Sequence, residues 1–221
     1  MDILTHQLFD APQMTVMRSV LLEDEKCWQD GIITAGSQAA QVKRNLQLDR
    51  KSQIAKDVSD QVIRRLKSDK LVKSFALLRR IHGVMFSRTG VGQGYGMHVD
   101  NAYMSSGRSD LSFTIFLSEP DSYEGGSLNI QTVQESKRVK LPAGHIVLYP
   151  STSLHEVENV TKGERFACVG WIQSYVKSAE DRTILFGLDA GARALLADHG
   201  QSPQLDLIFQ AYSNLLRRFG D

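Results

Sequence analysis

Two histidines, an aspartate and an arginine have the types and spacing to form a metal site beside an anion site. His98 and Asp100 are two residues apart, so in an extended segment their side chains project to the same side. With His155, drawn from a distant strand, they supply two imidazoles and one carboxylate. Such a set can occupy one face of an octahedral Fe(II) and leave the other positions open for oxygen chemistry. We therefore predict an iron site at His98, Asp100 and His155.

Arg165 has the features of an anchor for a carboxylate-bearing ligand. It follows His155 across residues 161–163, Thr-Lys-Gly, which have the composition of a hairpin turn. In such a hairpin the strands lie side by side, so His155 and Arg165 would face one cavity. The planar guanidinium matches a carboxylate through two hydrogen bonds. The apolar residues after Arg165 predict a buried strand, where a charge requires a designated anion.

Composition predicts one soluble globular protein with a sizeable core. The chain has 221 residues, and its net charge of +1 gives no reason to expect nucleic acid or a membrane as partner. Cys27 and Cys168 lie far apart, which argues against a disulfide framework and a zinc ribbon and fits a reducing cytosol. The N-terminal segment lacks a basic stretch followed by an apolar run. We expect a cytoplasmic protein.

The residues of the predicted site belong to a region with the pattern of a β-sandwich or barrel. Short apolar segments separated by turn residues predict eight strands, and this rhythm fits a jelly roll, also called a double-stranded β-helix. The eight segments are 84–88, 97–101, 111–118, 127–131, 138–141, 146–149, 155–160 and 166–175.

Helices are expected on both sides of this region. Residues 1–47 predict a short helix and a hairpin, and the apolar spacing over 52–67 predicts an amphipathic helix that packs against a sheet. Ser178 and Ser202 are in position to cap two further helices. We expect a jelly-roll domain over 1–177 and a helical extension over 178–221. The extension would pack on the same domain or on a second subunit, so a homodimer is one expected assembly.

Several longer motifs resemble a known family. The chain is similar to the Fe(II)- and 2-oxoglutarate-dependent dioxygenases, to their prolyl-hydroxylase-like group, and most closely to the bacterial PKHD-type hydroxylases. The resemblance covers most of the chain, from about Trp28 to Leu188. It rests on motifs that include 42–47 (Val-Lys-x-Asn-x-Gln), 95–100 (Tyr-Gly-Met-His-Val-Asp), 116–120 (Phe-Leu-Ser-Glu-Pro), 139–144 (Val-Lys-Leu-Pro-Ala-Gly) and 171–174 (Trp-Ile-Gln-Ser).

The resemblance implies a jelly-roll core and a defined set of cofactors. Fe(II) would be held by His98, Asp100 and His155, and 2-oxoglutarate would chelate the metal and place its distal carboxylate on Arg165. The reaction with O2 would hydroxylate an aliphatic C–H bond and release succinate and CO2, with L-ascorbate as a candidate reductant. The resemblance leaves open whether the substrate is a peptide or protein prolyl side chain, or a siderophore or another small metabolite.

One departure from the family concerns the co-substrate. Relatives usually have Asn-Arg-Tyr where this chain has Ser87-Arg88-Thr89, so the tyrosine that helps to seat the co-substrate is replaced by Thr89. Three outcomes stay open: the Thr89 hydroxyl serves, a group such as Tyr95 substitutes, or co-substrate affinity is lower.

The sequence also predicts apolar walls for the pocket and leaves two other functions open. Phe116 and Trp171, with Ile115 and Leu148, are expected to wall a dry pocket, although strand residues of these types usually pack in the core. One alternative to the dioxygenase is a non-catalytic jelly-roll module that senses iron or 2-oxoglutarate. Another is a cupin-like enzyme that uses Mn or Zn without an oxo acid; Arg165 argues against it, because such a site requires no carboxylate anchor.

Overall fold

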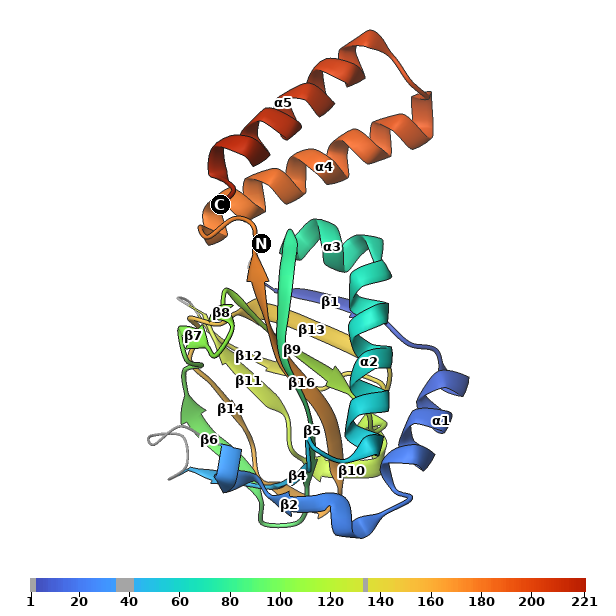
Figure 1. The fold of residues 1–221 in the computed structure, drawn as a ribbon, viewed down its shortest axis with the longest axis vertical. Helices are drawn as coiled ribbons and strands as arrows, with labels where there is room; N and C mark the ends of the chain where they lie inside the picture. The colour runs from blue at the N-terminus through green and yellow to red at the C-terminus, as the bar shows by residue number, and fades with distance from the viewer. Residues whose placement is uncertain (1–2, 35–41, 133–134) are drawn as a thin grey trace.

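Two antiparallel β-sheets form the body of the protein in the computed structural model, which describes residues 3–34, 42–132 and 135–221 (Figure 1). The predicted mainly β fold with flanking helices is confirmed. The seven-stranded sheet has the order β1 (Leu4–Gln7), β13 (His145–Pro150), β9 (Leu111–Phe116), β16 (Arg165–Ser174), β5 (Leu78–Thr89), β4 (Leu46–Leu48) and β2 (Trp28–Asp30). The five-stranded sheet has the order β12 (Ser136–Val139), β11 (Leu128–Gln131), β14 (His155–Val157), β6 (Gly94–His98) and β3 (Lys43–Arg44). Two short strand pairs are β7 (Tyr103–Met104) with β8 (Gly107–Arg108), and β10 (Tyr123–Gly125) with β15 (Val160–Gly163).

The central strand β9 is buried along its whole length because both faces of the larger sheet are covered. Phe113 and Ile115 belong to the core beneath the helices. Phe116 belongs to a second apolar cluster, in which the smaller sheet contributes Leu128 and Ile130. A strand covered on both faces is expected to be largely apolar, as β9 is. The space between the two sheets therefore contains both an apolar cluster and, farther along, the candidate site.

Helices α1 (Ala11–Leu21), α2 (Gln53–Ser68) and α3 (Lys70–Ala76) pack beside the larger sheet (Figure 1). The predicted amphipathic helix is confirmed as α2. It begins after Ser52, whose hydroxyl accepts a hydrogen bond from the Ala55 amide at 3.1 Å, and such a cap typically stabilises a helix by about 1 kcal/mol. Its apolar stripe, which includes Val58, Val62 and Leu66, is buried. The helix therefore covers the face of the larger sheet that is opposite to the candidate site.

The C-terminal helices α4 (Ala179–His199) and α5 (Pro203–Phe219) extend away from the sheets as a hairpin (Figure 1). Both predicted caps are present: the Ser178 and Ser202 hydroxyls accept from backbone amides in the first turns. The apolar stripe of α5 packs on this same chain at its C-terminal half. There Tyr212, Leu215, Leu216 and Phe219 lie against Leu77, Val176 and Leu185.

Ion pairs of Asp221 connect the hairpin of α4 and α5 to the body of the protein. The side chain of Asp221 pairs with Arg79 on β5 at 3.1 Å and with Arg108 on β8 at 3.0 Å. Arg108 also donates to Asp110 at 2.6 Å, and Asp110 accepts from the Ser174 amide at 2.8 Å. The end of α5 is thus connected through ion pairs to the loop between β8 and β9.

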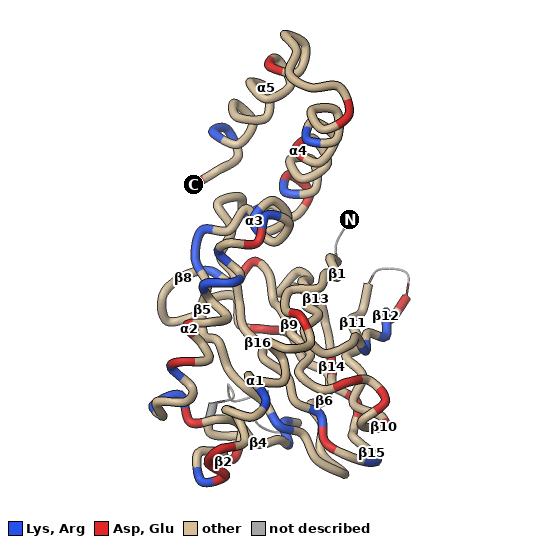
Figure 2. Tube along the Cα trace, turned by 90° about the vertical axis from the view of Figure 1, so that its right-hand side faces the viewer, with Lys and Arg blue, Asp and Glu red and all other residues tan. Residues whose placement is uncertain are grey.

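Charged residues are distributed without a dominant sign. Figure 2 shows basic and acidic positions interspersed over the sheets and the C-terminal helices, as expected for a net charge of +1. Among the described helices, none combines the length and the apolar character needed to cross a bilayer.

The chain between His155 and Arg165 is not the predicted hairpin. The predicted strand 155–160 is two strands, β14 and β15, which pair with different neighbours. The change of partner occurs at Asn159, where the backbone passes close to Gly125. Gly125 has φ +70°, and a Cβ there would collide with the Asn159 carbonyl oxygen, so glycine makes this crossing possible. As a result β14 lies in the smaller sheet and β16 in the larger one.

Two other expectations need adjustment. The strand predicted over 97–101 is β6, which ends at His98, so Asp100 lies beyond the strand end. In place of the hairpin predicted within residues 1–47, β2 pairs antiparallel with β4, but β3 lies between them in the chain and belongs to the smaller sheet, so β2 and β4 do not form a simple hairpin. Part of the chain that connects them, residues 35–41, lies outside the described residues. The predicted short helix in this region is α1.

Candidate active site

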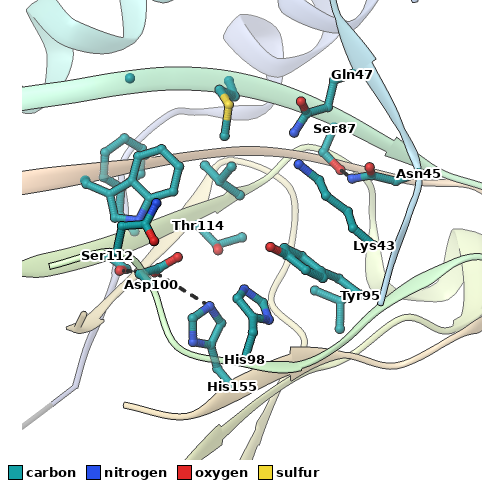
Figure 3. A pocket seen from close by; sticks show the side chains of 18 of the residues that line it. Lys43, Asn45, Gln47, Ser87, Tyr95, His98, Asp100, Ser112, Thr114 and His155 are labelled. Atoms are coloured by element: carbon teal, nitrogen blue, oxygen red, sulfur yellow. Dashed lines mark hydrogen bonds and ion pairs between the residues drawn. The ribbon is translucent and has the colours of Figure 1, made fainter. Parts of the chain in front are cut away.

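His98, Asp100 and His155 lie together between the sheets (Figure 3). Their ligand atoms all lie within 4.8 Å of one another. His155 on β14 is directly opposite His98 on β6 in the antiparallel register, and the centroids of the two rings are 4.2 Å apart. Asp100 reaches them from beyond the end of β6, with its Oδ2 3.7 Å from Nε2 of His155. The structure brings the three predicted residues together.

The backbone fixes which nitrogen of each imidazole is free. Nδ1 of His98 lies 2.8 Å from the carbonyl oxygen of Gly96, and Nδ1 of His155 lies 3.0 Å from that of Ser153. Because a carbonyl oxygen can only accept, Nδ1 carries the proton in both rings. Each Nε2 therefore presents a lone pair to the space between the rings, as a metal ligand must.

The surroundings keep His98 neutral. Burial and the neighbouring His155 lower the pKa of His98 to about 4. At neutral pH this imidazole is therefore unprotonated and available to a cation.

The carboxylate of Asp100 is held by a network of serine hydroxyls. Ser112 on β9 donates to Asp100 Oδ2 at 2.5 Å. Ser112 also lies 2.9 Å from the hydroxyl of Ser151, which is 2.8 Å from that of Ser109. All three serines are buried. Ser112, on a strand of the larger sheet, therefore orients Asp100, which follows the end of β6 in the smaller sheet.

Arg165 lies at the start of β16 and is only 2% exposed. Its guanidinium lies 5.5 Å above the ring of Phe116. Within the described part of the chain, its Nε and Nη2 atoms are buried without a hydrogen-bond partner. Burial lowers the pKa of Arg165, but an arginine at this position still remains charged at neutral pH. A buried cation with two unused donors is suited to bind an anion bidentately.

A cavity of about 360 Å³ connects the triad with Arg165. Thr89, Tyr95 and Trp171 line it, and Thr89 is paired with Arg165 across β5 and β16. Tyr95 stacks on His98 with a centroid distance of 3.6 Å, and burial raises the pKa of this tyrosine to about 12. The cavity is large enough for a small dicarboxylic acid and part of a second molecule.

Three of the residues expected to form the pocket wall have other positions. Phe116 lies beneath the guanidinium of Arg165 and outside the cavity lining. Ile115 and Leu148 belong to the core beneath the helices. Strand alternation is the reason for these two positions, since their side chains point to the face of the larger sheet that the helices cover. Of the four aromatic and aliphatic residues, Trp171 is the one that lines the cavity.

Several polar residues of the cavity were not predicted as site residues. Lys43, Asn45 and Gln47 line one wall, and Ser112 and Thr114 line another (Figure 3). A signal was available in the sequence, since Lys43, Asn45 and Gln47 are alternate residues, and alternate side chains of an extended segment project to the same side. Such a pattern identifies a wall only after the fold shows which face is enclosed.

Comparisons with known proteins agree with this geometry. Residues 84–173 match the family described as 2OG-Fe(II) oxygenase superfamily, and residues 180–221 match the PKHD-type hydroxylase C-terminal domain. A PKHD-type hydroxylase of Prochlorococcus marinus (strain MIT 9313) is 72% identical over 220 residues, which cover 100% of both chains.

Solved structures share the fold at much lower identity. A prolyl-4-hydroxylase of Pseudomonas putida has a TM-score of 0.57 and 18% identity, over 78% of this chain and 92% of that one. HygX of Streptomyces hygroscopicus, with nickel, 2-oxoglutarate and hygromycin B bound, has a TM-score of 0.55 and 14% identity, over 78% and 83%. At these identities the two structures show similarity of fold alone.

Proposed function

The chain belongs to the PKHD-type hydroxylases with a 2OG-Fe(II) oxygenase domain, and from this we propose that it hydroxylates an aliphatic C–H bond with Fe(II), 2-oxoglutarate and O2. The observation that carries the proposal is the pairing of two features in one cavity. A cluster of two imidazoles and a carboxylate faces a buried arginine whose Nε and Nη2 have no partner in the described chain.

We assign Fe(II) to His98, Asp100 and His155. The donor set fits the metal, because two neutral imidazoles and one carboxylate on one face are typical of non-haem Fe(II) oxygenases. The hydrogen bonds at both Nδ1 atoms and at Asp100 orient the three ligands before the metal arrives. Such preorganisation strengthens binding, because little ordering of side chains is left to the binding step.

We assign the distal carboxylate of 2-oxoglutarate to Arg165. The two unpartnered donors of its guanidinium fit a carboxylate, and the cavity joins them to the triad. We assign to Thr89 the role of the tyrosine of relatives, because Thr89 is the cross-strand neighbour of Arg165 and lines the cavity. Tyr95 lies at the metal end, where its ring supports His98. Phe116 supports the guanidinium from below.

When bound, Fe(II) and 2-oxoglutarate supply the oxidising chemistry, in which succinate and CO2 are released and one oxygen atom enters the substrate. The chain's own residues position and protect this chemistry. Arg165 fixes one end of the co-substrate, the Ser112 hydroxyl holds the Asp100 carboxylate, and Trp171 forms part of the wall that limits water. Arg165, Ser112 and Trp171 lie on strands of the larger sheet, and Asp100 follows the end of β6.

The proposal is tested by two measurements on the purified protein. Anaerobic Fe(II) with 2-oxoglutarate is expected to give a weak visible charge-transfer band, and a cupin-like site would give none. In air, with ascorbate as the proposed reductant, succinate release is expected above a blank containing the His155→Ala variant. A band without succinate, with candidate substrates present, would instead indicate a sensor of iron or 2-oxoglutarate.

The substrate is proposed at the level of class. The structural relatives named above include a prolyl-4-hydroxylase and a protein with hygromycin B bound, so a peptide side chain and a small metabolite both fit the family. A screen of candidates by mass spectrometry, for a gain of one oxygen, identifies the substrate. We also propose that residues 1–177 form the oxygenase domain and that residues 178–221 form its helical extension.

Replacement of Ser112 by alanine is expected to weaken iron binding without abolishing it. The hydroxyl orients Asp100 but is not itself a ligand, and the loss of such an outer partner typically costs about 10- to 100-fold in metal affinity. Competition with a chelator measures the effect. The Ser118→Ala variant, which removes another buried serine at the end of the same segment, serves as the control. Equal iron affinity in Ser112→Ala and Ser118→Ala would contradict the orienting role.

A further inference from the structure

Tyr149 is a buried tyrosine of the cavity to which the proposed function gives no role. It lies on β13, is 3% exposed and lines the cavity. Its ring meets the ring of His155 in a T-shaped contact, with 5.1 Å between the two centroids. The ring of Tyr149 therefore lies beside the proposed metal site.

The neighbouring strand β9 runs along the cavity from the metal end to the Arg165 end. Residues 112, 114 and 116 alternate along this strand, so their side chains point to the same side. Ser112 donates to Asp100, and Phe116 lies beneath the guanidinium of Arg165. Thr114 is the middle one of the three and lines the cavity (Figure 3). Its hydroxyl therefore lies part of the way from the metal ligands to the anchor.

The side chain of Tyr149 extends in the same direction. Its backbone is paired with Ser112, at the metal end, in the antiparallel register. Its hydroxyl interacts with Thr114, two residues farther toward Phe116, and it also interacts electrostatically with Arg165. The hydroxyl thus lies between the metal site and the anchor, along the path that 2-oxoglutarate would span.

The phenol of Tyr149 is able to donate a hydrogen bond. Burial raises the pKa of Tyr149 well above its ordinary value, so the phenol keeps its proton at neutral pH. A hydrogen bond with Thr114 acts on the pKa in the opposite direction, as expected when the threonine hydroxyl donates to the phenol oxygen. The phenol hydrogen is then available for another acceptor.

A buried carboxylate accepts more hydrogen bonds than Arg165 donates. Its two oxygens offer about four acceptor positions, and a bidentate arginine uses two of them. The remaining positions also need donors, because a buried acceptor without a partner is costly. The Thr89 hydroxyl can serve one of them from β5. A further donor is therefore expected at the Arg165 end of the cavity.

We propose that the Tyr149 hydroxyl donates a hydrogen bond to the distal carboxylate of bound 2-oxoglutarate, so that Tyr149 selects an oxo acid with a carboxylate at that end. The proposal rests on the proposed function and adds a specificity-determining residue to its co-substrate site. It also bears on the departure at Thr89. A phenol still reaches the co-substrate, from β13 rather than from β5.

Two oxo acids that differ only at the distal end test the proposal. They are 2-oxoglutarate and 2-oxopentanoate, which has a methyl group in place of the distal carboxylate. Each is titrated anaerobically into the Fe(II)-loaded protein by means of the visible band. In Tyr149→Phe, which keeps the ring, 2-oxoglutarate is expected to bind about 10- to 100-fold more weakly, because a hydrogen bond to a charged group is lost. The affinity for 2-oxopentanoate, and the affinity for Fe(II) measured by competition with a chelator, are expected to stay unchanged.

The controls separate this proposal from the proposed function. Tyr175→Phe removes the hydroxyl of an exposed tyrosine just beyond β16 and is expected to bind both oxo acids as the unmodified protein does. Absence of the Fe(II)–2-oxoglutarate band in the unmodified protein would refute the proposed function. With the band present, unchanged affinity for 2-oxoglutarate in Tyr149→Phe would refute the contact. Equal weakening of both oxo acids, or weaker binding of Fe(II), would also refute it, because such a disturbance of the site does not depend on the distal carboxylate.

Discussion

The Asp100→Ala variant is expected to lose iron and turnover together. Asp100 supplies the one carboxylate among the three clustered ligands, and its loss leaves two neutral imidazoles to hold a divalent cation. Removal of an outer-shell partner typically costs about 10- to 100-fold in metal affinity, and removal of a ligand must cost more. The protein, purified after incubation with Fe(II), is expected to contain far less than one iron per chain. Succinate release is expected to fall to the level of the blank.

The control for this variant is Asp121→Ala, which removes an exposed carboxylate in the turn before β10. It is expected to keep both iron and turnover. Circular dichroism shows whether the fold is retained, because the Ser112 hydroxyl loses its acceptor in Asp100→Ala. One iron per chain in a folded Asp100→Ala protein would mean that the metal is held by other residues.

The Arg165→Ala variant is expected to lose affinity for 2-oxoglutarate while iron binding changes little. Removal of one partner of a buried, hydrogen-bonded charge pair costs about 2 to 5 kcal/mol, which is roughly 30-fold to several thousand-fold in Kd. The band that 2-oxoglutarate forms with Fe(II) provides the titration. Arg165→Lys retains the charge without the planar pair of donors, so we expect an affinity between those of the other two proteins. Arg138→Ala, at an exposed arginine, is the matched control.

A different replacement of Arg165, by leucine, has the opposite expected effect, on stability. Without co-substrate, the Arg165 guanidinium is a buried charge with two donors that have no partner in the described chain. Replacement by Leu removes this cost and is expected to leave the free energy of unfolding of the cofactor-free protein unchanged or higher. Urea unfolding measures it. A strongly destabilised Arg165→Leu protein, or an Arg165→Ala protein with normal 2-oxoglutarate affinity, would show that Arg165 has a structural role instead.

The sequence alone determined the features that depend on short-range chemistry. The amphipathic helix α2 and the serine caps at 178 and 202 follow from apolar spacing and hydrogen bonds within a few residues. The residue types at 98, 100 and 155 likewise indicated an iron site, and the arginine at 165 indicated a site for a carboxylate-bearing ligand. The helix and its caps can be predicted because the interacting groups are close along the chain, and the chemistry of the site can be predicted because the residue types themselves indicate it.

Only the tertiary structure decided how distant segments meet. His155 and Arg165 face one cavity because the chain crosses from the smaller sheet to the larger one between them, not because they lie in one hairpin. The same enclosure places Lys43, Asn45 and Gln47 in the cavity wall and turns the hydroxyl of Ser112 toward Asp100. The physical reason is that alternation along a strand gives two faces, and only the packing of the two sheets determines which face is enclosed.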